Sequence, residues 1–99
     1  MVDARYWVYI LLCENNAYYT GYTNNLEKRY QSHIDGRSKC KYTRSFKPVE
    51  IAQSWLIPGD KAQAMHVERA IKKLSRQQKM QLIGCPDTLH TFNLVLPHV

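Results

Sequence analysis

The chain has 99 residues, enough for one domain with a single hydrophobic core, and 44% of its residues are hydrophobic. A formal net charge of +6, with 14 lysines and arginines against 8 acidic residues, favours a nucleic acid or another polyanion as partner. The charged fraction of 22% argues against disorder, and no apolar run approaches the roughly 20 residues of a membrane span. We therefore expect one domain over residues 1–99 and no membrane partner.

The apolar run Trp7–Cys13 is short, and no basic cluster precedes it, so we expect no signal peptide. Three cysteines, Cys13, Cys40 and Cys85, are odd in number, far apart and without the spacing of a zinc site. We interpret them as reduced packing residues, which predicts a cytoplasmic protein.

The first predicted elements are two strands joined by a turn. Residues 5–13 and 17–23 are rich in β-branched and aromatic side chains, and Glu14-Asn15-Asn16 between them is typical of a turn. These residues predict an antiparallel hairpin.

The length of the hairpin loop decides which side chains share a face. A two-residue turn would place Tyr9 and Tyr19 on opposite faces. A three-residue loop would pair Tyr9 with Gly21 and Tyr19 with Leu11, so that both tyrosines share one face. The sequence permits either register. We adopt the three-residue loop, because asparagine tolerates the positive φ that such a loop needs.

A helix follows the hairpin. Asn24 as N-cap, with Glu27 three residues later, predicts its start, and Gly36 predicts its end after about Ile34. The apolar residues Leu26, Tyr30 and Ile34 are spaced by four and form its buried stripe.

Two reactive side chains accompany that stripe. Arg29 and His33 are four residues apart and directly beside it. We therefore expect both at the edge of the buried face, pointing into the groove between helix and sheet.

The second half of the chain predicts one more strand and two more helices. Residues 36–47 are interpreted as a basic, polar loop, 48–57 as the third strand and Pro58-Gly59 as a turn. Asp60, with Gln63 three residues on, starts a helix whose apolar face is Ala64, Val67, Ile71 and Leu74.

Glu68 falls on the rim of that apolar face. Ser75 with Gln78 indicates a further helix, which ends at Gly84-Cys85-Pro86. Residues 87–99 form a C-terminal tail or a short strand, and the sequence does not decide between them. The order of elements predicts an α+β fold, with a small three-stranded antiparallel sheet flanked by helices.

The spacing of these residues resembles the GIY-YIG nuclease domain, and is closest to its short single-domain bacterial members. The Gly-Ile-Tyr motif of the family corresponds to Trp7-Val8-Tyr9, and its Tyr-Ile-Gly motif to Tyr19-Thr20-Gly21. The resemblance covers about residues 5–80 and continues through Arg29 and His33 to Glu68. Two positions depart from the family pattern. Trp7 replaces the first glycine. Many members also use an asparagine about a dozen residues after the glutamate, and none lies near Lys79 in this sequence.

The resemblance implies a Mg²⁺-dependent (or Mn²⁺-dependent) endonuclease that hydrolyses DNA. Its catalytic residues would be Tyr9, Tyr19, Arg29, His33 and Glu68. Glu68 would bind the metal, since Mg²⁺ needs few protein carboxylates when phosphate oxygens and waters complete its shell. Arg29 would clamp the phosphate, and Tyr19 would orient the water or the phosphate.

Tyr9 would be the general base by resemblance to the family, although only about one phenol in a thousand ionises at pH 7 when its pKa is about 10. Positive charge from Arg29, a bound cation or His33 would lower that pKa. Alternatively, His33 takes or relays the proton. The sequence leaves both routes open.

Basic side chains on both sides of this constellation predict contacts with DNA phosphates. The expected contacts are Lys28, Arg37, Lys39, Lys41, Arg44, Lys72 and Lys79. Such contacts position a nucleic acid without reading its sequence, so we expect a preference for DNA structure, as in repair or recombination. The alternative is a non-catalytic nucleic-acid-binding module with the same fold, which the two departures from the motif favour.

Overall fold

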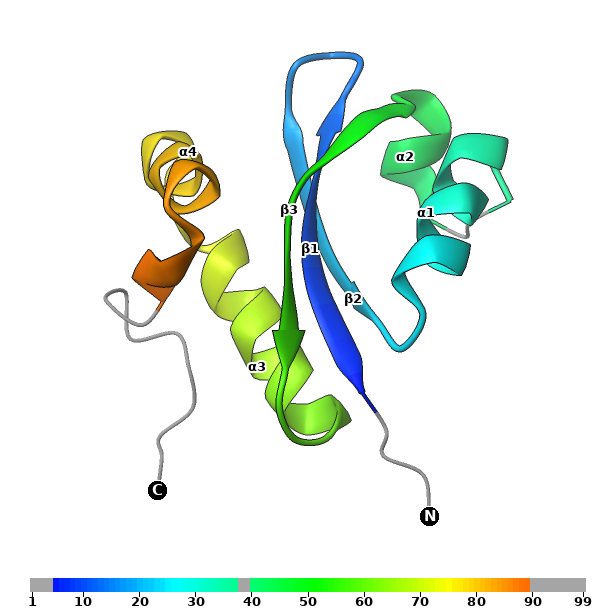
Figure 1. The fold of residues 1–99 in the computed structure, drawn as a ribbon. Coiled ribbons are helices and arrows are strands. Elements are labelled where there is room, and N and C mark those ends of the chain that lie inside the picture. The colour runs from blue at the N-terminus through cyan, green and yellow to red at the C-terminus, as the bar shows by residue number, and fades with distance from the viewer. Residues whose placement is uncertain (1–4, 38–39, 90–99) are drawn as a thin grey trace.

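The computed structural model describes residues 5–37 and 40–89 and has the predicted α+β architecture. A three-stranded antiparallel sheet in the order β2-β1-β3 lies between two groups of helices (Figure 1). The elements are β1 (Tyr6–Cys13), β2 (Tyr18–Thr23), α1 (Leu26–Asp35), α2 (Lys41–Ser45), β3 (Pro48–Ile57), α3 (Lys61–Lys72), α4 (Arg76–Gly84) and the 3₁₀ helix η1 (Pro86–Leu89).

The three-residue hairpin loop is confirmed. The amide of Cys13 donates to the Ala17 carbonyl at 2.9 Å, and Asn16 adopts a φ of 65°. This is the left-handed residue that closes a three-residue loop. Tyr9 therefore pairs with Gly21 and Leu11 with Tyr19, so both tyrosines lie on one face of the sheet.

The central strand β1 is buried on both faces, which explains why its sequence is continuously apolar. On one face, Val8 and Ile10 pack against α3 and α4 in the main core. On the other face, Tyr9 and Leu11 form a second cluster, against which side chains of α1, α2 and β3 pack. The site described below lies on this second side.

Helix α1 begins one residue later than predicted. Its N-cap is Asn25, whose side chain accepts the amide of Lys28, and Asn24 lies outside the helix. The hydroxyl of Thr23 holds Asn25 in place by accepting the Asn25 amide at 3.1 Å. Both asparagines are good caps, and this tertiary detail selects between them.

The other helix boundaries follow the sequence closely. Gly36 ends α1 with a φ of 74°, Asp60 caps α3, and Ser75 forms a capping box with Gln78 at the start of α4. The prediction of a loop over residues 36–47 was wrong in part, because Lys41–Ser45 forms the short helix α2. A helix this short gives no periodic signal and depends on its packing against α1.

The C-terminal segment is described only to Leu89. Pro86–Leu89 forms η1, and Leu89 is buried in the main core. Residues 90–99 of the predicted tail lie outside the described residues. None of the helices within the described ranges is long and apolar enough to cross a membrane.

One polar group in the core predicts a stabilising substitution. Thr20 is 3% exposed, and its hydroxyl has no hydrogen-bond partner among the described residues. Thr20→Val should raise the free energy of unfolding by about 1 kcal/mol, measured by urea denaturation, because the cost of burying that hydroxyl disappears.

Thr43→Val is the matched control for this prediction. Thr43 is equally buried, but its hydroxyl lies 2.7 Å from His33 Nδ1. Its loss should lower stability by about 1–3 kcal/mol. A destabilised Thr20→Val variant would contradict the argument.

Candidate functional site

A pocket of about 330 Å³, called the tyrosine pocket below, gathers four of the five predicted site residues. Tyr9 comes from β1, Tyr19 from β2, Arg29 from α1 and Glu68 from α3. Residues at the β2–α1 corner, including Thr23 and Asn24, complete the wall together with Tyr6, Gly21, Tyr22 and Lys61. The structure thus brings these side chains together from four elements.

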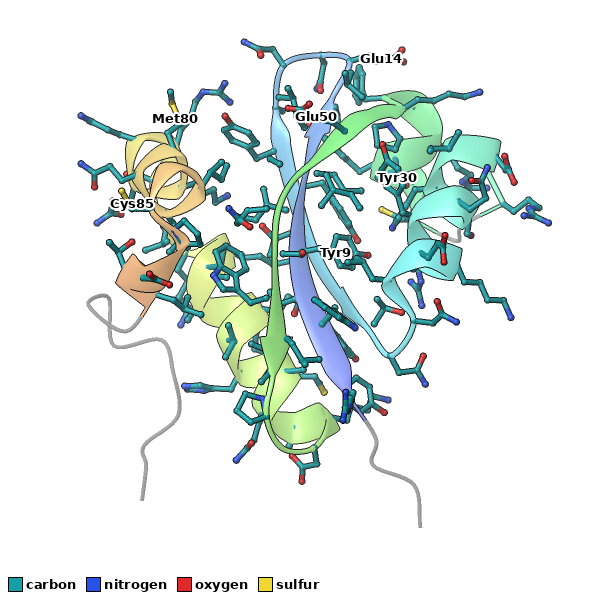
Figure 2. All side chains as sticks on the ribbon, in the orientation of Figure 1. Tyr9, Glu14, Tyr30, Glu50, Met80 and Cys85 are labelled. Carbon is teal, nitrogen blue, oxygen red and sulfur yellow. The ribbon has the colours of Figure 1, made fainter. Side chains whose placement is uncertain are left out.

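Gly21 allows the Tyr9 ring to lie where it does. A Cβ atom added at Gly21 would be 2.6 Å from the Tyr9 hydroxyl oxygen and 2.8 Å from Cζ. Only a residue without a side chain lets the phenol cross the neighbouring strand at this point. The hydroxyl then reaches Nε2 of His33 at 3.0 Å. Figure 2 shows Tyr9 on the same side of the sheet as Tyr30 of α1.

His33 lies deeper than predicted. The sequence placed it at the rim of α1, but its side chain is fully buried, because α2 covers this face of α1. Its Nδ1 is 2.7 Å from the hydroxyl of Thr43, which itself donates to the Cys40 carbonyl at 3.4 Å. We assign the proton of the ring to Nδ1, because the Thr43 hydroxyl is then its acceptor. Nε2 is left to accept from Tyr9.

The charge states of this pair follow from burial. Burial, with a smaller contribution from the Arg29 charge, lowers the pKa of His33 to about 4, so the ring is neutral at pH 7. Burial also raises the pKa of Tyr9, and the opposing charge of Arg29 is too weak to reverse this. The charge of Arg29 does lower the Tyr9 pKa, as predicted, but the larger effect of burial, which was not predicted, sets the net direction. Before substrate binds, Tyr9 is a protonated donor and His33 a neutral acceptor.

Tyr19 is held by residues around α2. Its ring stacks on Tyr42, with centroids 6.1 Å apart and 15° between planes, and meets the His33 ring edge-on at 5.5 Å. Its hydroxyl is hydrogen-bonded to the side chain of Cys40. Burial, assisted by this bond, raises the pKa of Tyr19, so Tyr19 is also protonated at neutral pH.

Glu68 is the acidic group of the pocket. Its side chain is 13% exposed, and its Oε2 pairs with Nζ of Lys72 one helical turn away at 3.1 Å. Within residues 5–37 and 40–89, no three His, Cys, Asp or Glu side chains group as metal ligands. A single carboxylate fits Mg²⁺, which keeps most of its waters and takes phosphate oxygens as further ligands. The donor set does not fit a structural zinc site.

Sequence reasoning missed several residues of the site. Thr43 and Cys40 hold His33 and Tyr19, but both lie in the segment that was interpreted as a loop. Lys61 lines the pocket seven residues before Glu68, on the same side of α3, and that spacing is a signal available in the sequence.

The predicted phosphate contacts are spread over three places. Lys28 and Arg37 line a second pocket of about 520 Å³, the basic pocket, which shares Thr23, Asn24 and Arg29 with the tyrosine pocket. Lys41 and Arg44 are exposed on α2. Lys72 pairs with Glu68, and Lys79 is half-buried on α4, where burial and its neighbour Arg76 lower its pKa. Lys39 lies outside the described residues.

The buried histidine predicts a pH-dependent stability. His33 is harder to protonate in the folded protein than in the unfolded chain, where its pKa is about 6.5. Its contribution to stability is therefore complete above pH 6.5 and is lost as the pH falls towards 4. The loss amounts to about 3 kcal/mol.

Chemical denaturation between pH 4 and pH 8 measures this effect. His33→Gln should remove that part of the pH dependence, whereas His66→Gln, at an exposed position on α3, should retain it. Identical pH profiles for wild type and His33→Gln would contradict the assignment.

Gly21→Ala predicts a local disruption. The new methyl group pushes the Tyr9 ring away from His33, so we expect a loss of about 1–3 kcal/mol in stability and a changed His33 ring environment in NMR spectra. Gly84→Ala is the control, because nothing lies within 4 Å of a Cβ added there. An unchanged His33 signal in Gly21→Ala would refute the steric argument.

Comparison with known proteins gives a consistent result. Residues 5–81 match the model of the GIY-YIG catalytic domain. A UPF0213 protein of Xanthomonas axonopodis pv. citri is 42% identical over 84 residues, which are 84% of this chain and 80% of that protein. A UPF0213 protein of Clostridium perfringens is 47% identical over 78 residues, 79% and 82% of the two chains.

A solved structure agrees with these relatives. The solution NMR structure of a UPF0213 protein from Bacillus halodurans shares 36% of its sequence with this chain and superposes with a TM-score of 0.51. The match covers 93% of this chain and 99% of that one. The conserved domain, the sequence relatives and the shared fold place this chain in the GIY-YIG family, alongside the UPF0213 proteins.

Proposed function

We propose that this protein is a divalent-metal-dependent endonuclease that hydrolyses DNA phosphodiester bonds in the tyrosine pocket. The GIY-YIG domain is a nuclease fold, which supports the reaction class. The observation that carries the proposal is the hydrogen bond from the Tyr9 hydroxyl to a neutral, buried His33. A proton acceptor is thereby held directly behind the phenol of Tyr9.

The basic residues bind and orient the substrate. Arg29 is exposed at the junction of the tyrosine and basic pockets, so its guanidinium can grip a phosphate with two parallel hydrogen bonds. Lys28 and Arg37 in the basic pocket would hold a neighbouring phosphate. Tyr19, fixed by Tyr42 and Cys40, would position the attacking water beside the phosphate.

The proton route follows the observed hydrogen bonds. The Tyr9 oxygen takes the proton of the attacking water as its own proton passes to His33 Nε2. His33 keeps its other proton on Nδ1, and this N–H group donates a hydrogen bond to the Thr43 hydroxyl. The relay avoids a free phenolate, which burial disfavours at this position. It makes His33 cationic instead, which burial also disfavours, so we expect His33 to hold the proton only while the anionic phosphate occupies the pocket.

Glu68 would hold the metal ion. When bound, Mg²⁺ or Mn²⁺ supplies Lewis-acid charge that stabilises the leaving oxygen. Lys72 must give up Oε2 of Glu68 for this, and its half-exposed side chain can turn to solvent while the metal ion takes over the charge of Glu68. The freed ammonium group would then face the substrate.

We further propose that the substrate is recognised through its structure, with a role in DNA repair or recombination in the cytoplasm. Apart from Glu68 and two asparagines, the polar groups of the tyrosine and basic pockets are cations and hydroxyls suited to phosphates. The second candidate function, a binding module without cleavage, is favoured by the raised pKa of Tyr9.

A cleavage assay tests the proposal and separates it from the second candidate. Purified protein is incubated with nicked, flapped and cruciform DNA, with Mg²⁺ or with chelator. We expect cutting only with Mg²⁺. Glu68→Gln and Tyr9→Phe should each reduce the cleavage rate at least about 100-fold, with binding retained.

Glu50→Gln is the matched control for the carboxylate. Glu50 is exposed on β3, the strand at the opposite edge of the sheet from β2, and should keep wild-type activity. If wild type binds DNA but never cuts it, the protein is the binding module. Chelator-resistant cutting that Glu68→Gln leaves intact would sink the proposed mechanism.

A further inference from the structure

A third hollow, the aromatic pocket, lies on the same side of the sheet and plays no part in the chemistry above. It is a shallow, open hollow of about 460 Å³ and is lined mainly by apolar surface. Its apolar residues are Trp7 of β1, Leu26 and Tyr30 of α1, and Ile51 of β3. A pocket this large and apolar can take a flat organic ligand.

The aromatic pocket is continuous with the other two. Asn24 lines all three pockets, and Asn25 lines both the basic and the aromatic pocket. Around Asn24, the tyrosine pocket with its candidate catalytic residues adjoins the cationic basic pocket, which in turn adjoins the apolar aromatic pocket. A nucleotide has the same three parts, since each phosphate of a strand is followed by a sugar and a flat, largely apolar base.

We propose that the aromatic pocket binds one nucleobase of the DNA strand whose phosphates occupy the basic and tyrosine pockets. This inference rests on the proposed function for the strand but adds a ligand and a site. Trp7 and Tyr30 supply aromatic surface on which a base stacks, and such stacking accepts any base. Asn25 and Glu27 at the rim offer polar groups to the edge of the base.

The role of Trp7 is the strongest part of the argument. In the resembling motif a glycine stands at this position, which would leave the pocket without its wall from β1. Trp7 is only half-buried and belongs to neither core cluster of the described residues. Trp7 extends the apolar surface of Leu26, Tyr30 and Ile51 into one contiguous patch, and such a patch points to a ligand-binding role.

The neighbouring charge favours a nucleobase over an apolar protein partner. Lys28, Arg29 and Arg37 line the adjoining basic pocket, whereas Glu27 is the one acidic residue that lines the aromatic pocket. A ligand that spans both pockets must be apolar at one end and anionic at the other. A strand of nucleic acid meets both requirements.

The test compares two strands of equal length and charge, oligothymidylate and an oligomer of abasic deoxyribose phosphate. Binding is measured by fluorescence anisotropy in chelator, so that cleavage plays no part. Wild type should bind the intact strand about tenfold or more tightly than the abasic strand. In Trp7→Ala this ratio should fall by about tenfold, and Trp7→Phe should restore most of it.

A matched variant and a spectroscopic signal sharpen the test. Leu56, the cross-strand partner of Trp7, is 45% exposed and does not line the pocket, so Leu56→Ala should keep the wild-type ratio. Trp55 packs against the main core, and its Nε1 bonds the Pro86 carbonyl, so Trp55→Phe leaves Trp7 as the sole indole fluorophore. In that variant the intact strand should quench the fluorescence, and the abasic strand should not.

The outcomes separate this inference from the proposed function. A binding ratio unchanged in Trp7→Ala, without quenching of Trp7, overturns the nucleobase site even if the protein cuts DNA. A ratio that depends on Trp7 supports the site even if the protein never cuts. If Trp7→Ala instead dissociates a dimer in sedimentation experiments and leaves the ratio intact, the pocket binds a second copy of the chain and the inference is wrong.

Discussion

The hydrogen bond between Tyr9 and His33 is the constraint on which the site depends. It joins β1 to α1 inside the protein, where His33 is fully buried and Tyr9 is 1% exposed at the wall of the tyrosine pocket. A buried phenol and a buried imidazole satisfy each other, so neither carries the cost of an unpaired polar group. The bond also requires Gly21 beneath the ring and Thr43 behind the histidine. The arrangement of residues that lie far apart in the sequence thus depends on the single hydrogen bond between Tyr9 and His33.

The two faces of the sheet have different roles, one in the main core and the other in the candidate site. Val8 and Ile10 face α3 and make the main core, while Tyr9 faces α1 and makes the site. Glu68 crosses this division, because it comes from α3 and yet lines the tyrosine pocket. In the described part of the chain no residue of β3 lines the tyrosine pocket, and β2 is an edge strand, so residues from both layers meet around that edge. The acidic group and the phenols therefore approach a substrate from different layers.

Much of the fold was readable in the sequence, because its signals are local. The third strand was predicted over its observed length, and the caps at Asp60 and Ser75 mark helices that form there. Hairpin register was left open by the residues alone, and the positive φ of Asn16 decides it.

The site was predicted less completely, because its details are tertiary. Arg29 and Glu68 were placed correctly at the edges of their helices and line the pocket. The burial of His33 depends on α2, a helix of five residues that no periodicity reveals. The net rise of the Tyr9 pKa was missed for the same reason, since the sequence shows which charges are near but not how much water is excluded.

The hairpin loop has a consequence for how this sequence can vary. Side chains alternate along a strand, so Tyr9 and Tyr19 share a face only while the loop between their strands keeps an odd number of residues. Adding or removing one residue would turn Tyr19 towards α3 and would cost the chain its site while leaving both strands intact. Adding two residues would cost far less. The hairpin loop therefore tolerates insertions or deletions of an even number of residues better than those of an odd number. A sequence alignment shifted by one residue in this loop would assign the second tyrosine to the wrong face of the sheet.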